Sequence, residues 1–548
     1  MQEGYYEIDQ IQAIPHYAGV AAEQRGLKRD LRLRHMVMIA ISGTIGTGLF
    51  LTSGSTIATA GPGGALLAYT IIGLWVVFVC QAIGEIATLL PLPGAFNAWG
   101  GRVFDEALSF QMTWMYFINW ALTISAELSA SAVIIEYWLP AGSNFPVWIV
   151  PLSIIVLMVI INMAGVRAYG ELEYWFSILK IITIVMFVVC GILVDAGVLG
   201  GVKYGMKAWH VVGAPFKGGI IGFLRTLVAV GYSYGGTEMI GVTAAESRNP
   251  HKHVPKAVNT VFLRIAIFYI LSIFLLGSIV MNDDPALMNA DSSAAKAPFT
   301  LVFAKAGVSA AANYINAVIF TSVFSAINSD YYIATRTLLS LARNGWAHKS
   351  IGYTNARGVP LVAVGIVTIS SCLSLITIFV GSGVVFKWFV SIIGSLLFQS
   401  WMLILLLHFR FRYCWKKQDH QVVDLPYVSW GYPYGNILAA VIGGCCIVAT
   451  WYLSIINPPR NPGSGATPEE MSAYYTARDT YIQGLLGAWF PWVISAILFF
   501  SFKFIRGTKL IKAENADLDT GRFIPSESDK EDMRANRSTW KRILQFVV

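Results

Sequence analysis

The chain has 548 residues, of which 55% are hydrophobic and only 13% are charged. Soluble proteins devote about a quarter of their residues to charged side chains, so the composition predicts a membrane protein and excludes disordered, collagen-like and disulfide-scaffold proteins. The formal net charge of +8 does not indicate a nucleic-acid partner, because the basic residues are spread between apolar segments instead of forming one stripe. The cysteines show no metal-ligand spacing, and we expect no metal and no cofactor.

Apolar segments long enough, or nearly long enough, to cross a bilayer recur along most of the chain. A spanning helix needs about 20 apolar residues, and on that criterion we expect about twelve spans. The segments are 36–60, 65–90, 111–139, 147–163, 174–195, 219–245, 258–281, 299–335, 359–380, 385–409, 434–456 and 479–502. We therefore expect an all-α polytopic membrane protein, with an N-terminal tail at 1–35, a transmembrane transporter domain at 36–505 and a C-terminal tail at 506–548.

Both tails are expected on the cytoplasmic side. An even number of spans places both ends on one side, and loops rich in Lys and Arg stay inside the cell. With a cytoplasmic N-terminus, the inner loops carry most of the basic residues, for example Arg336, Arg343, Lys349 and Arg357. The outer loops are short or acidic, apart from the lysines between the fifth and sixth spans.

The first span is interrupted by small and polar residues near its middle, in the run Ser42-Gly43-Thr44-Ile45-Gly46-Thr47-Gly48. Glycine permits non-helical backbone, and unwound backbone at membrane depth is tolerated only around a cavity or a ligand. The freed amides are then a carboxylate site. The candidate substrate-binding residues are Ser42, Gly43, Thr44, Gly46, Thr47 and Gly48.

The sixth span repeats this design in the run Tyr232-Ser233-Tyr234-Gly235-Gly236-Thr237-Glu238. Interruptions at corresponding positions of two transporter halves point to a substrate site at the membrane midplane. The candidate substrate-binding residues here are Tyr232, Tyr234, Gly235 and Glu238. For either cluster the alternative is that the glycines allow close helix packing.

Three ionisable residues inside predicted spans are candidates for function, since a charge there costs about 2.5–3.5 kcal/mol on insertion scales. Glu127 lies among small residues near the middle of the third span. Burial favours its neutral form, which makes it a candidate proton carrier; the alternative is a structural, hydrogen-bonded acid. Lys180 either extends back to the inner surface or acts as a fixed cation beside the first-span break. Glu238 binds substrate, exchanges a proton or caps a half-helix.

Motifs spread along residues 27–505 resemble one transporter family. They are Leu27-Lys28-Arg29 to His35, Met38 to Phe50, Gly84-Glu85, Asn119-Trp120, Glu127-Leu128, Gly236-Thr237-Glu238, Asn328-Ser329 and Gly358-Val359-Pro360. Together they are similar to the fungal (yeast-type) amino acid permeases of the amino acid–polyamine–organocation (APC) superfamily. The resemblance implies a ten-helix core of two five-helix inverted repeats (a LeuT-like fold), two further helices, and proton-driven amino acid uptake at the plasma membrane.

The resemblance also implies residue roles. It places the substrate carboxylate at Gly46, Thr47 and Gly48, and the substrate ammonium at carbonyls near Thr44, Tyr232 and Gly235. Tyr234 becomes a candidate aromatic wall, and Glu127 matches a glutamate of the side-chain pocket or proton path. Lys180 matches a lysine that takes the place of a bound sodium ion. Ser125, Tyr232 and Tyr234 depart from the common Pro and Phe, so the pocket is expected to be more polar.

The leading hypothesis is a proton-coupled amino acid symporter. Its partners are the amino acid, protons, the lipid bilayer and cytoplasmic regulators that bind the tails. The alternatives on the same fold are an amino acid sensor (transceptor) and a transporter of polyamines or quaternary amines. We do not expect an enzyme, since the H-E-x-x-H motif is absent from the sequence.

Overall fold

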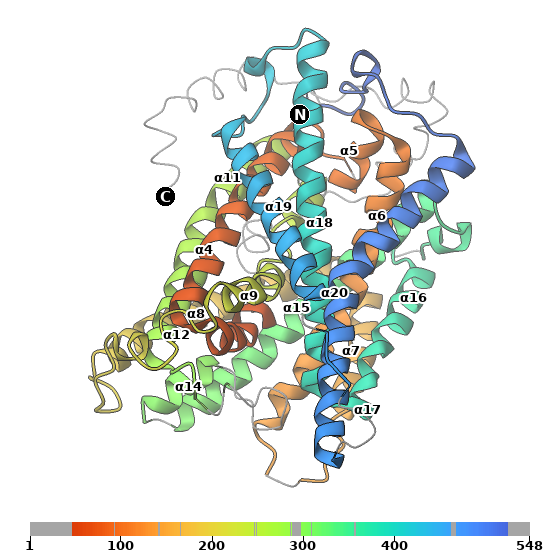
Figure 1. Ribbon diagram of the computed structural model, residues 1–548. Helices are drawn as coiled ribbons and strands as arrows, with labels where there is room; N and C mark the ends of the chain where they lie inside the picture. Colours follow the sequence, from red (N-terminus) through yellow and green to blue (C-terminus); the bar gives the residue numbers. More distant parts are fainter. Residues whose placement is uncertain are drawn as a thin grey trace.

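The computed structural model describes residues 46–92, 94–140, 143–164, 166–245, 247, 249–284, 287, 298–307, 309–355, 358–456, 458–461 and 467–523. Most of these residues are helical, and none of them forms a β-strand. They fold into a bundle of long helices (Figure 1). This is the fold of an all-α polytopic membrane protein, in which each helix pairs its own backbone groups because a bilayer offers them no partners.

The first two predicted spans meet at a sharp kink. α3 (Thr47–Phe50) leads into α4 (Thr52–Leu89), which holds the end of the first span and the whole of the second. Inside α4, Gly61 has a φ of 75° and is followed by Pro62. A Cβ at Gly61 would lie 2.6 Å from the carbonyl oxygen of Pro215. Glycine is therefore required for the turn between the two spans.

The other predicted apolar segments coincide with helices in the described part of the chain, whereas α5 (Phe96–Val103) lies between the second and third segments. In chain order the others are α6 (Glu106–Glu136), α7 (Ile149–Ala164), α8 (Val166–Asp195), α9 (Gly219–Ser233), α10 (Met239–Ala244), α11 (Pro250–Arg264), a π-helix (Ile265–Leu271), α12 (Ser272–Ile279), α14 (Pro298–Lys305), α15 (Ser309–Arg343), α16 (Leu361–Ser371), a 3-10 helix (Cys372–Ile376), α17 (Thr377–Val380), α18 (Ser382–Lys417), α19 (Tyr434–Ile455) and α20 (Pro468–Arg506). The predicted segment 299–335 was too long for one span. It divides into α14 and α15 near Gly307, which has a φ of 81°.

Among the described residues, eight helices are long and apolar enough to cross a membrane, and α7 and α9 supply shorter apolar stretches. This number is below the twelve predicted segments partly because α4 contains two of them and the sixth segment is broken. α15 is 35 residues long, but it carries Ser325, Asn328 and Asp330 among its buried side chains. A long helix with a polar interior face indicates a site inside the bundle.

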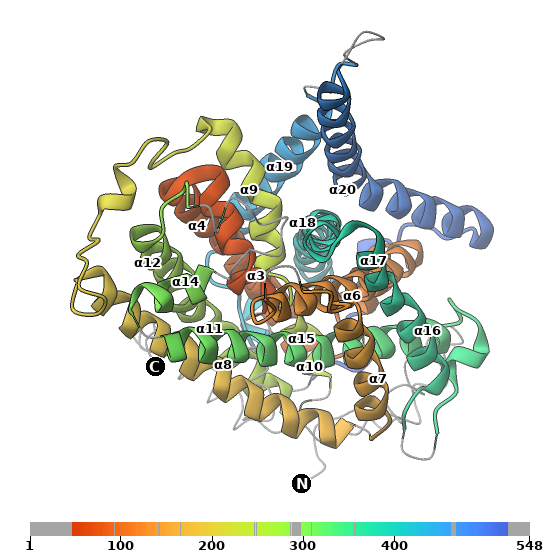
Figure 2. The ribbon, with the colours of Figure 1, turned by 90° about the horizontal axis from the view of Figure 1, so that it is seen from below.

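α6 lies at the centre of this bundle. It packs along α15 and α18, while α4 packs along α9 and α3 contacts both α9 and α15. Viewed along the bundle in Figure 2, α3, α6 and α15 lie together in the middle, whereas α7, α16 and α20 lie to one side. The first and sixth spans therefore meet α6 and α15 inside the protein.

A buried ion cluster joins α4, α18 and α19. Glu85 of α4 accepts hydrogen bonds from Nη2 of Arg412 at 2.7 Å and from the backbone N–H of Ser429 at 2.7 Å. It also lies 2.9 Å from Nε2 of His408, whose Nδ1 is 2.7 Å from Nδ2 of Asn436. Since all of these side chains are buried, removing one charge leaves its partner unpaired in a medium that solvates it poorly.

Glu85→Gln is expected to destabilise the protein by about 3–5 kcal/mol, because it leaves the buried guanidinium of Arg412 without its counter-charge. The measurement is the melting temperature of detergent-solubilised protein. Glu469→Gln, a change at an exposed acid in the first turn of α20, is the matched control and should melt like wild type. Equal melting of the two variants would contradict a structural role for the cluster.

Candidate functional site

The sixth span is broken in the structure. α9 ends at Ser233 and α10 begins at Met239, and Gly236 between them has a φ of 89°. A Cβ at Gly235 would lie 2.9 Å from Cδ1 of Leu397. Gly236 therefore adopts a backbone conformation that favours glycine, and Gly235 allows α18 to approach the break.

The described part of the first span begins at Gly46, which has extended backbone and caps α3. The predicted site residues Ser42, Gly43 and Thr44 lie outside the described residues. Gly48 packs tightly against the end of α9, since a Cβ there would lie 2.5 Å from Cα of Ser233. At this position the close-packing role proposed for glycine is present.

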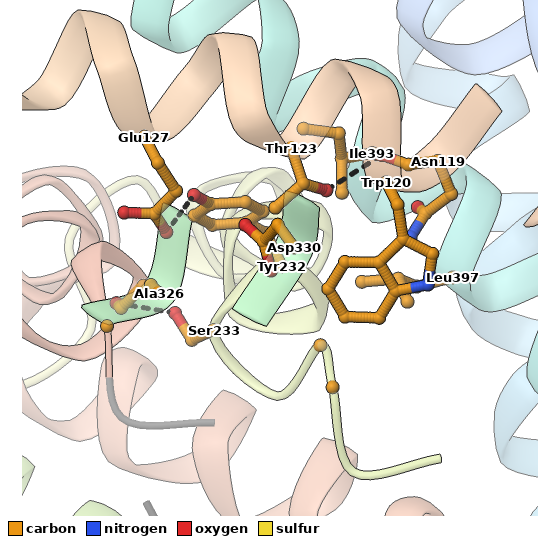
Figure 3. Close-up of a pocket in the computed structure, with 14 residues that line it drawn as sticks. Asn119, Trp120, Thr123, Glu127, Tyr232, Ser233, Ala326, Asp330, Ile393 and Leu397 are labelled. Atoms are coloured by element: carbon orange, nitrogen blue, oxygen red, sulfur yellow. Dashed lines mark hydrogen bonds between the residues drawn. The ribbon is translucent and has the colours of Figure 1, made fainter. Parts of the chain in front are cut away.

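A cavity lies where the two spans meet α6, α15 and α18 (Figure 3). It leaves about 40 Å³ free, far less than the roughly 300–1,000 Å³ of typical small-molecule sites, so the surrounding helices are closed around it. The lining residues are Gly46, Gly48, Asn119, Trp120, Thr123, Glu127, Tyr232, Ser233, Gly235, Gly236, Ala326, Asp330, Ile393 and Leu397. The residues from α6 recur at helical spacing, so one face of this helix forms a wall.

Glu127, Thr47 and Tyr232 form a ring of oxygen atoms at one end of the cavity. Thr47 Oγ1 donates to Oε1 of Glu127 at 2.7 Å, and the Tyr232 hydroxyl donates to the same atom at 3.1 Å. The two hydroxyl oxygens are themselves 2.7 Å apart. The ring joins α3, α6 and α9, which are parts of the first, third and sixth spans.

Lys180 is enclosed in the bundle, with only 2% of its surface exposed. The side chain therefore does not extend to the inner surface. It lies within electrostatic range of three carboxyl groups, those of Glu127, Glu173 and Asp330. Glu173 lies seven residues earlier on the same face of α8, and it accepts hydrogen bonds from Ser325 at 3.1 Å and from Asn328 at 3.3 Å.

The sequence analysis did not single out Glu173 or Asp330. Glu173 falls one residue before the apolar segment predicted at 174–195. Asp330 lies inside the segment predicted at 299–335 and carries the same signal as Glu127, an acid within an apolar run. That signal could have identified it.

Four of the predicted site residues that the structure describes do not line the cavity: Thr47, Lys180, Tyr234 and Glu238. Tyr234 is buried behind it: its hydroxyl donates to the carbonyl of Tyr69 at 2.9 Å, and its ring stacks on Tyr269 with centroids 4.4 Å apart. Tyr232, two positions earlier, is the aromatic residue of this break that faces the cavity. Glu238 is also buried outside the lining, near Trp401, whose Nε1 lies 3.5 Å from Oε2.

A second and larger space lies on the other side of a thin layer of side chains. It is lined by residues that include Thr52, Phe386, Arg225 and Lys387. Thr52 Oγ1 lies 2.8 Å from Oγ of Ser233, and the ring of Phe386 meets that of Tyr232 edge-on with centroids 6.1 Å apart. These two contacts separate the two spaces.

No group of three or more His, Cys, Asp and Glu side chains in the described part of the chain could hold a metal ion. The cavity instead offers backbone groups at the start of α3 and at the break between α9 and α10, together with aromatic faces and carboxyl groups. Such a set binds a small polar molecule with both apolar and charged parts.

Comparison with known proteins identifies the family. The amino acid permease family matches residues 35–491. The chain is 40% identical to the histidine permease HisP of Lactococcus lactis, over 90% of this chain and 98% of that protein. It is 37% identical to the lysine-specific permease LysP of Escherichia coli, over 89% of this chain and 96% of that protein. It is 34% identical to the amino-acid permease GAP5 of Candida albicans, over 99% of this chain and 84% of that protein. The chain belongs to the amino acid permease family of the APC superfamily, and it is an amino acid transporter, not an enzyme.

Gly46 and Gly48 are expected to have different roles. Gly46 has room for a methyl group beside the cavity, whereas Gly48 is packed against α9. A Cβ at Gly46 would make ordinary contacts, 3.4 Å from Oε1 of Glu127 and 3.7 Å from Cβ of Ala326. We expect Gly46→Ala to reach the surface normally and to lower uptake by about tenfold, because the methyl group occupies the cavity. Gly48→Ala should reduce the amount of folded protein, because the new Cβ meets the backbone of Ser233. Uptake per surface molecule is the measurement, and wild-type uptake by Gly46→Ala would contradict ligand binding beside this residue.

Proposed function

We propose that this permease takes up amino acids across the plasma membrane together with protons. The observation that carries the proposal is Glu127, a buried carboxyl group that lines the cavity and is hydrogen-bonded to both broken spans. A group that carries a proton in a coupled transporter has to sense the ligand and the conformation of the gates. Glu127 is hydrogen-bonded to the side chains of Thr47 on α3 and Tyr232 on α9, the elements that we expect to contact the ligand and to move.

The oxygen ring can hold either two or three protons. When Glu127 is ionised, the hydroxyl protons of Thr47 and Tyr232 can make the two contacts of 2.7 Å. When Oε1 carries a proton, that proton can make the third contact, of 3.1 Å. Each hydroxyl group can donate once and accept as well. Neither form therefore leaves Oε1 without a hydrogen bond, so the ring supports both states of a proton carrier.

We place the substrate carboxylate at the start of α3 and the substrate ammonium at the sixth-span break. The amides of Thr47 and Gly48 belong to the first turn of a helix, where N–H groups have no intrahelical partners. The carbonyl of Tyr232 accepts from the N–H of Gly235 and keeps a second lone pair. Support for this pose comes from the cavity lining, which includes Gly46, Gly48 and Gly235.

Lys180 in this proposal is a fixed cation that balances part of the acidic charge around the cavity. Its burial and its three carboxyl neighbours support that role. A fixed ammonium removes the need for a metal cation at this place. In this proposal proton movement supplies the coupling energy.

The orientation with cytoplasmic tails is supported by where the described part of the C-terminal tail lies. Ile511 N–H donates to the carbonyl of Phe104 at 2.8 Å, and Arg410 Nη2 donates to the carbonyl of Ile511 at 2.6 Å. Gln418, just beyond the last turn of α18, donates to the carbonyl of Ala516 at 2.7 Å. The tail thus contacts the basic end of α18, the end that the distribution of Lys and Arg places inside the cell.

The coupling role is tested with Glu127→Gln, which keeps the shape of the side chain and removes its titration. We expect the variant to lose accumulation of amino acid against a gradient and to keep exchange of internal for external amino acid, because binding remains and proton movement does not. Radiolabelled uptake across an amino acid panel at two pH values, in a host without its own permeases, measures both. Accumulation that stays concentrative and steeply pH-dependent would remove Glu127 from the proton path.

The two tyrosines of the sixth-span break form a matched pair. Tyr232→Phe removes one oxygen of the ring at the cavity, and we expect it to change the ranking of competing amino acids. Tyr234→Phe removes a hydrogen bond to the carbonyl of Tyr69, at a cost of about 1 kcal/mol in stability, and should leave the ranking unchanged. A competition panel measures the ranking. A ranking altered by Tyr234→Phe alone would contradict the placement of these two side chains.

A further inference from the structure

We propose that the cavity binds amino acids with a positively charged side chain, and that Asp330 receives this charge. The inference rests on the proposed function and adds a substrate class and a specificity-determining residue to it. It concerns a side chain to which neither the sequence motifs nor the comparisons assign a role.

Asp330 has the position that such a residue needs. It lies on α15, one helical turn after Ala326, and both residues line the cavity. Only 4% of its surface is exposed, and its Oδ2 has no hydrogen-bond partner among the described residues. Figure 3 shows Asp330 beside Tyr232, between Glu127 at one end of the site and Trp120 at the other. A buried carboxyl oxygen without a partner is costly, so a ligand that supplies a donor is favoured.

The charges around Asp330 leave acid in excess. Its electrostatic neighbours are the acids Glu127 and Glu173 and the single cation Lys180. Three carboxyl groups therefore share one ammonium in a region screened from water. Protons or a cationic ligand can balance the remainder. A substrate with a cationic side chain brings that charge with it, whereas a neutral substrate requires the acids to hold protons.

The unused polar atoms of the cavity are also mainly acceptors. The lining hydroxyl groups are engaged: Thr123 donates to the carbonyl of Asn119 at 2.8 Å, and Ser233 donates to the carbonyl of Gly48 at 2.7 Å. Oδ2 of Asp330 and Oε2 of Glu127 have no hydrogen-bond partner in the described ranges. Ammonium, guanidinium and imidazolium groups supply several N–H donors and no acceptor, which suits two carboxyl oxygens.

Aromatic faces complete the environment for a cation. Trp120 and Tyr232 line the same cavity as Asp330, and the faces of Trp and Tyr attract a cation by about 0.5–2 kcal/mol, depending on desolvation. The cations Arg225 and Lys387 line the second space, beyond the contact of Tyr232 with Phe386. They face a different part of the path and do not neutralise the acids of the cavity.

The experiment compares pairs of amino acids that differ in charge but hardly in shape. In the full-length protein, arginine and citrulline, and lysine and norleucine, compete with a radiolabelled amino acid that the wild type takes up. We expect the cationic member of each pair to compete at least about tenfold better, which corresponds to the 1.5–3 kcal/mol typical of a hydrogen bond to a charged group. Asp330→Asn should reduce that preference to threefold or less, and Asp330→Glu should keep most of it.

The outcomes separate the two proposals. Equal competition within each pair by the wild type, with amino acid uptake intact, overturns the cationic substrate class and leaves the transport proposal standing. Loss of cationic and neutral substrates together in Asp330→Asn, at normal surface level, overturns Asp330 as the residue that discriminates charge. Absence of uptake for every amino acid tested overturns the proposed function itself.

If Asp330→Asn fails to reach the surface, a second measurement decides the substrate class. It compares the melting-temperature shifts that arginine and citrulline cause in purified wild type, and equal shifts overturn the cationic substrate class.

Discussion

The carboxyl group of Glu127 is the contact on which the arrangement of this site depends. It is buried in the middle of α6, and it is hydrogen-bonded at 2.7 Å to Thr47 and at 3.1 Å to Tyr232. These partners lie at the start of α3 and near the end of α9. One carboxyl oxygen thus holds the ends of α3 and α9 against α6. Any change in its protonation changes the contacts among three helices at once.

The broken spans can sustain this arrangement because glycine occupies positions where no side chain fits. Gly48 lies against the backbone of Ser233, and Gly235 lies against Leu397. The same glycines bring backbone groups to the cavity. Close packing, one of the two explanations of a glycine cluster, is therefore present in both clusters, and ligand binding stays a prediction.

The sequence was sufficient to predict an all-helical membrane protein and its apolar segments, because composition and segment length are local signals. The rare charges within spans singled out Glu127 and Lys180, which are both buried. It did not distinguish Tyr232 from Tyr234. In a helical stretch the spacing fixes which side chain faces inward, but a break has no such period, and only the fold shows that Tyr234 stacks on Tyr269. Asp330 was missed because the polar face of α15 lies within a segment that was judged by its apolar content alone.

We propose that amino acid and protons cross the membrane together, and the two fluxes can be measured in one experiment. The most direct measurement uses purified protein in sealed liposomes that contain a pH-sensitive dye, with no pH gradient and no membrane potential at the start. We expect substrate added outside to acidify the interior, at a rate that follows amino acid uptake and vanishes in Glu127→Gln. Amino acid uptake at the wild-type rate without acidification of the interior would contradict the proposal.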